Sequence, residues 1–275
     1  MNRKAALFLG VLFFCIPEIS SGQSKPRVVH VFVALADNQH QGIVPVPAAL
    51  GNGDDPARNL YWGAAFGVRT FFRKSAEWKE TATIPHPKSY ILERSVFQDS
   101  SGGVFLIADA YRGSEIKQAL MDFFQAAAGL QENKPLFSSV AGGVPYQVCL
   151  DAELVVYVGH DGLMDFPLAI DFAERTGPSR SAIILACASR SFFRDLLRSS
   201  GATPLLWTTG LMAPEAYTLK AALDGWKQKE SKEQIRERAA GAYAKYQSAA
   251  MLQPCGCSLQ IGKAPGGPGV WLART

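Results

Sequence analysis

The chain is poor in cysteine and histidine and carries little excess charge of either sign. Its 275 residues include five cysteines, four histidines, 28 basic residues and 24 acidic residues. Five cysteines are too few for a fold held together by disulfides, and a scattered charge of +4 is too small to predict nucleic-acid binding. The apolar content of 48% excludes collagen, long coiled coils and disordered polymers. A globular protein with an ordinary core remains.

The N-terminal segment differs from the rest of the chain. Residues 3–4 are basic, residues 5–17 are apolar and residues 20–22 are small, an order typical of a secretory signal peptide. The apolar run is shorter than the roughly 20 residues that a membrane-spanning helix needs. We therefore predict a signal peptide over residues 1–22, cleaved after Gly22, and a periplasmic or secreted protein without a membrane anchor. No small residue directly precedes Cys15, which argues against a lipoprotein.

Behind this segment, β-rich apolar runs alternate with amphipathic stretches. Continuous apolar runs are typical of parallel strands that are buried on both faces, and apolar residues spaced by three and four positions are typical of helices. The alternation predicts an α/β protein with a mainly parallel sheet flanked by helices on both faces. The expected strands cover residues 27–36, 90–97, 103–111, 152–158, 181–186 and 204–209, and the expected helices cover residues 55–72, 115–128, 192–200, 214–229 and 232–250.

No internal repeat or linker divides the chain, so we predict one α/β domain over residues 26–250. Residues 251–275 form a tail rich in glycine and proline that contains Cys255 and Cys257. A C-x-C spacing without a second pair or a nearby histidine is a weak signal for a metal site. In an exported protein the two cysteines are either disulfide partners or free thiols, and the sequence leaves both open.

Two chemically active side chains follow two of the expected buried strands. His160 is the only histidine that directly follows such a strand, and Cys187 follows the next one. Ligands of open parallel sheets bind beyond the carboxyl ends of the strands. If the two strands are neighbours, the imidazole and the thiol lie at the same edge, as a cysteine nucleophile with a proton-accepting histidine requires.

The segments Tyr157-Val158-Gly159-His160 and Ala186-Cys187-Ala188-Ser189 carry a family resemblance. An apolar strand that ends in His-Gly, followed by one that ends in Ala-Cys, resembles the caspase-like cysteine peptidases, the group of caspases, metacaspases, legumain, gingipains and CHAT peptidases. The resemblance implies a caspase–hemoglobinase-like fold and an exported cysteine endopeptidase. It also implies a peptide or protein substrate and neither cofactor nor metal.

The same resemblance assigns roles to individual residues. It implies Cys187 as the nucleophile, His160 as the general acid and base, and the backbone N–H groups of Gly162 and Cys187 as donors to the oxyanion. Further residues are implied to bind the substrate: an acid at Asp37 that favours a basic side chain, and a groove wall made of Trp207, Thr208, Thr209 and Gly210.

Asp161 marks a departure from this pattern, because it separates His160 from the glycine that directly follows histidine in the family. It either polarises the imidazole or marks an inactive relative. The alternative function is therefore a catalytically inactive caspase-like domain that binds peptides or protein partners. A different α/β hydrolase is a third hypothesis, weakened by the absence of a G-x-S-x-G motif.

Overall fold

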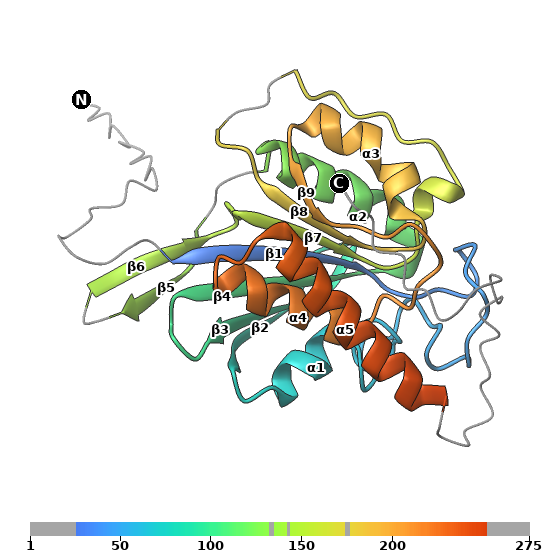
Figure 1. Cartoon of the computed structure of the whole chain (residues 1–275), viewed down its shortest axis with the longest axis horizontal. Coiled ribbons are helices and arrows are strands. Elements are labelled where there is room, and N and C mark those ends of the chain that lie inside the picture. The colour runs from blue at the N-terminus through green and yellow to red at the C-terminus, as the bar shows by residue number, and fades with distance from the viewer. Residues whose placement is uncertain (1–25, 132–134, 142–143, 174–176, 252–275) are drawn as a thin grey trace, which may run out of the picture.

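The computed structural model describes residues 26–131, 135–141, 144–173 and 177–251. The predicted signal peptide, the tail beyond Met251 and the cysteines in that tail lie outside these residues. Within them, a seven-stranded sheet has the strand order β2-β3-β4-β1-β7-β8-β9 (Figure 1). Its strands are β1 (Arg27–Ala34), β2 (Trp78–Lys88), β3 (Ile91–Asp99), β4 (Val104–Tyr111), β7 (Leu154–Val158), β8 (Ser181–Leu185) and β9 (Thr203–Leu206).

The sheet is parallel from β4 through β1, β7 and β8 to β9, whereas β2 and β3 form an antiparallel extension. The prediction of an α/β protein with a mainly parallel sheet is thus confirmed. Two helices, α2 and α3, cover one face, and α1, α4 and α5 cover the other (Figure 1). The helices are α1 (Val68–Lys74), α2 (Ile116–Ala128), α3 (Ser189–Ser200), α4 (Ala216–Lys227) and α5 (Lys232–Met251).

Alternating residues of the central strand β1 explain why both faces are apolar. Val29, Val31 and Val33 belong to the core beneath α1, α4 and α5, whereas Phe32 and Ala34 belong to the core beneath α2 and α3. A strand in the middle of a two-sided sheet exposes neither face, so nearly every position is apolar. This requirement produced the continuous apolar runs by which the strands were predicted.

The prediction of a helix over residues 55–72 is wrong for most of its length. Helix α1 begins only at Val68, and residues 55–66 form successive turns. Asn59 is fully buried there, and its side chain bonds the backbone N–H and C=O of Ala36 at 3.0 and 2.8 Å. This long-range pairing anchors the segment to the end of β1, and local helix signals carry no information about it.

Three strands were missed. The edge strand β2 contains two prolines, and the hairpin of β5 (Pro135–Ala141) and β6 (Val144–Cys149) projects from one end of the sheet (Figure 1). Proline is tolerated at a sheet edge because one side of an edge strand needs no ladder donors. In the part of the chain that the structure describes, no helix is both long and apolar enough to cross a membrane.

Candidate active site

The candidate site lies at the carboxyl edge of the parallel strands. Strand β1 pairs with β4 on one side and with β7 on the other, so the loops that leave β1 and β7 start at the point where the strand order reverses. In open α/β sheets this crevice is where ligands bind. Val158 of β7 is paired with Leu185 of β8, and His160 and Cys187 each follow two residues later. The two side chains therefore occupy equivalent positions on neighbouring strands.

Cys187 is a free, half-buried thiol in the turn between β8 and α3. Its Sγ lies 3.5 Å from the carbonyl oxygen of Met212 and accepts the Met212 N–H at 3.4 Å. The next residue, Ala188, has φ 46° and ψ 27°. A residue with a Cβ is strained in this left-handed conformation, and strain of this kind is typical of functional sites.

Residues 207–210 hold this turn in place. The N–H groups of Ala188 and Arg190 donate to the carbonyl oxygens of Gly210 and Thr208, both at 2.9 Å. The Thr208 hydroxyl is buried and donates to the carbonyl of Ala186. Thr208 therefore faces the Cys187 turn and supports it. Of the other residues implied as a groove wall, Trp207 is half-buried, Thr209 is exposed and Gly210 borders open space.

The surroundings of Cys187 favour the neutral thiol. Burial raises the pKa of Cys187, the Met212 N–H opposes this effect, and the charge of Asp161 raises the pKa further. Tyr61, which is buried, has its own pKa raised by burial and then by the charges of Cys187 and Glu215. The ionisable groups coupled to the thiol are thus acidic or phenolic. In the resting structure Cys187 is protonated at neutral pH.

His160 is held by a carboxylate that the sequence analysis missed. Its Nε2 lies 2.7 Å from Oδ2 of Asp165, which also accepts the N–H of Gly42 at 3.2 Å. The 3-10 turn η2 (Gly162–Met164) folds the chain back and brings Asp165 to the imidazole. A base oriented by a third group is the arrangement used by nucleophilic enzymes. An acid five residues after a strand-terminal histidine is the sequence signal that would have found Asp165.

Gly162 and Asp161 form the turn between these two residues. The N–H of Gly162, implied as an oxyanion donor, donates at 3.1 Å to the carbonyl oxygen of His160. Asp161 is fully buried, and its Oδ1 accepts the N–H of Leu163 at 3.1 Å. Its Oδ2 is buried and has no hydrogen-bond partner. In this conformation the turn therefore uses the Gly162 donor and leaves one Asp161 oxygen unsatisfied.

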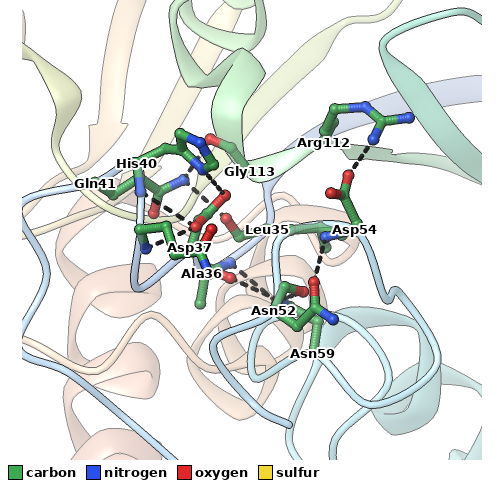
Figure 2. A network of polar contacts seen from close by, with 11 residues as sticks. Leu35, Ala36, Asp37, His40, Gln41, Asn52, Asp54, Asn59, Arg112 and Gly113 are labelled. Atoms are coloured by element: carbon green, nitrogen blue, oxygen red, sulfur yellow. Dashed lines mark hydrogen bonds and ion pairs between the residues drawn. The ribbon is translucent and has the colours of Figure 1, made fainter. Parts of the chain in front are cut away.

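Asp37, implied as the acid that selects a basic substrate, uses both of its oxygens within its own loop (Figure 2). Oδ1 accepts the N–H groups of Gln39 and His40, and Oδ2 lies 2.8 Å from Nδ1 of His40. Gly53 and Gly113 pack so closely that a Cβ on either would overlap the Asp37 side chain. Asp37 as a whole is 5% exposed, and its carboxylate fixes the loop after β1.

Comparison of the chain with protein-family models, curated protein sequences and solved structures found no match. Among the described residues, no group of three or more histidine, cysteine, aspartate or glutamate side chains is arranged to hold a metal ion.

Proposed function

We propose that the protein is an exported cysteine endopeptidase with a caspase-like fold, in which Cys187 is the nucleophile and His160 the base. The observation that carries the proposal is the position of the two residues, each two places beyond a paired residue of neighbouring parallel strands. Asp165 is added as the group that orients the imidazole. The mainly parallel sheet with helices on both faces is compatible with the α/β fold that the resemblance implies.

The proposed reaction follows from these positions. Because Nε2 of His160 is engaged by Asp165, Nδ1 takes the thiol proton. The sulfur then attacks the peptide carbonyl carbon, and the amide C–N bond breaks as the imidazolium returns the proton to the leaving amine. Water, deprotonated by His160, hydrolyses the thioester and restores the thiol. The amide substrate and water are the only reactants.

The loops around the site favour a polypeptide substrate. Val44, Met164, Phe192 and Leu211 are 72%, 45%, 40% and 70% exposed. They lie in the loops after β1, β7 and β9 and in the first turn of α3, all at the carboxyl edge. Exposed apolar side chains are a feature of surfaces that bind protein segments. A small polar substrate would gain nothing from them.

The test uses the mature protein and a mixed library of quenched fluorescent peptides. We expect Cys187→Ala and His160→Ala each to lower hydrolysis by about a thousandfold or more, and Asp165→Asn to lower it about tenfold or more. Matched controls are Cys149→Ala, at a buried thiol, and His86→Ala, at an exposed histidine of the edge strand β2. Hydrolysis that survives Cys187→Ala would refute the proposal.

A second function is favoured by the neutral thiol and the engaged Gly162 donor: a catalytically inactive domain that binds peptides. In that case the wild-type protein binds library peptides without cleaving them, and Cys187→Ala binds equally well.

Export is tested separately by N-terminal sequencing of the protein from cell fractions. A first residue of Gln23 in the exported fraction supports it, and an intact Met1 contradicts it.

A further inference from the structure

Asp161 is a buried carboxylate with an unsatisfied oxygen. It is fully buried between His160 and Gly162, and its Oδ1 bonds the Leu163 N–H at 3.1 Å. Its Oδ2 is buried and has no hydrogen-bond partner. Buried polar atoms are nearly always paired, and a charged oxygen without a partner is costly. The carboxyl group is therefore better accommodated with its proton than without it.

The groups that surround Asp161 reinforce this preference. Asp165 lies in the same loop, Cys187 follows the neighbouring strand β8, and Tyr157 lies at the end of β7. Each of them is neutral or negative at neutral pH. The adjacent imidazole of His160 is committed to Asp165 through Nε2. Burial raises the pKa of Asp161 to about 7 and the charge of Asp165 adds to this, whereas the backbone N–H groups of Leu163 and Met164 oppose it.

The same charge acts on the proposed nucleophile. Burial is the main cause of the raised pKa of Cys187, and the Met212 N–H opposes it. The negative charge of Asp161 raises this pKa further, because it disfavours the thiolate. Coupling between two ionisable groups is reciprocal, so a proton on Asp161 favours a thiolate and a thiolate favours a proton on Asp161. The two groups thus compete to carry one negative charge. A substrate oxyanion next to the sulfur is subject to the same repulsion.

We propose that Asp161 controls the reactivity of Cys187 through its own charge, so that the site forms its nucleophile readily only while Asp161 is protonated. The inference rests on the proposed function, because it assumes that Cys187 is the nucleophile. Asp161 acts through Cys187 and does not contact the substrate. Burial alone already favours the neutral thiol, and a charge on Asp161 strengthens that preference.

The test measures alkylation of Cys187 by iodoacetamide between pH 5.5 and 9.5, followed by mass spectrometry of the Cys187 peptide. Asp161→Asn removes the charge, keeps an acceptor for the Leu163 N–H and places a donor where Oδ2 was unsatisfied. Asp161→Ser is the second variant, since serine also accepts such a bond at the start of a helical turn. The matched control is Asp171→Asn, at an exposed aspartate in the loop that follows.

We expect both Asp161 variants to react about threefold to tenfold faster than wild type above pH 7, and at the wild-type rate below pH 6. A tenfold increase corresponds to one pKa unit in the thiol. Asp171→Asn should follow the wild-type profile throughout. Folded Asp161 variants whose profiles superimpose on that of wild type would overturn the inference and leave the proposed function standing. A folded wild-type protein in which Cys187 reacts no faster than the buried Cys149 at any pH would overturn both.

Discussion

Asp109→Asn tests whether an ion cluster within the sheet stabilises this fold. Asp109 of β4 lies directly opposite Arg94 of β3 and accepts two bonds from its guanidinium, at 2.6 and 2.7 Å. His30 of β1 adds a contact of 2.9 Å between Nε2 and Oδ2. Asp109 and His30 are fully buried and Arg94 is 6% exposed. The cluster joins three neighbouring strands beneath the face covered by α2.

The magnitude follows from the charge of Asp109. Burial alone raises its pKa, but the hydrogen bonds from Arg94 and His30 outweigh burial and lower the pKa to about 2. Against about 3.9 in the unfolded chain, this is about two units, or about 2–3 kcal/mol. Because the folded pKa is lowered, this stability is fully present above about pH 4 and is lost as the pH falls towards 2. At neutral pH, Asp109→Asn also leaves the Arg94 charge buried and unpaired, which costs about 3–5 kcal/mol.

The assay is urea unfolding of wild type and Asp109→Asn at a series of pH values from 7 to 2.5. We expect the variant to be about 3–5 kcal/mol less stable at pH 7, and the difference to shrink by somewhat less than about 2 kcal/mol, or about two thirds of the full contribution, at pH 2.5. Asp195→Asn is the control, because its ion pair with Arg198 has side chains that are 71% and 78% exposed. Such pairs contribute about 0–1 kcal/mol.

A cost of less than about 1 kcal/mol for Asp109→Asn at pH 7 would contradict a stabilising ion cluster, and so would a difference from wild type that is the same at every pH. Either result would mean that burial of the Arg94 and Asp109 charges costs as much as their mutual attraction returns. A second variant replaces both charged partners by apolar residues. Arg94→Met combined with Asp109→Leu should recover much of the stability that Asp109→Asn loses, because the Arg94 charge is then no longer buried without a partner.

Two further predictions concern the loops that carry the site. Asn59→Ala removes the bonds to both backbone groups of Ala36 and should lower the free energy of unfolding, measured by urea titration, by about 2–4 kcal/mol. The control is Asn52→Ala, at an exposed asparagine, which should cost less than about 1 kcal/mol in the same titration. Ala188→Gly relieves the positive φ beside Cys187 and should raise stability by about 0.5 kcal/mol, whereas Ala221→Gly in the middle of α4 should lower it by about 1 kcal/mol. A destabilised Ala188→Gly would contradict the strain at this turn.

The pattern of apolar residues in the sequence was enough to predict most of the central architecture. The runs that became β1, β7 and β8 and the periodic stretches that became α2, α4 and α5 were located to within a few residues. Such patterns can be recognised in the sequence because burial of a strand or of a helix face requires apolar residues at positions that are close together in the chain. The same patterns placed His160 and Cys187 directly after strands, and the structure added that these strands, β7 and β8, are neighbours.

The missed strands show where local signals mislead. In β2, Pro85 and Pro87 are breakers in sequence terms, yet the strand lies at an edge where missing donors are tolerated. The hairpin of β5 and β6 was overlooked although Gly142-Gly143 is a typical two-residue turn signal. The turns over residues 55–66 depend on Asn59 bonding Ala36, which lies 23 positions earlier in the chain.

Only the tertiary structure decided the chemistry around the thiol. The sequence contains Asp161 and Asp165 next to His160 but does not indicate that Asp165 bonds the imidazole, or that Asp161 keeps one oxygen buried and unsatisfied. Likewise, the sequence shows His30 only as a polar residue within an apolar strand. The folded sheet places Asp109 of β4 beside it, and Arg94 of β3 beside Asp109. Strand and helix patterns arise from near neighbours in the chain, whereas the charge state of a buried group depends on partners that only the folded chain brings together.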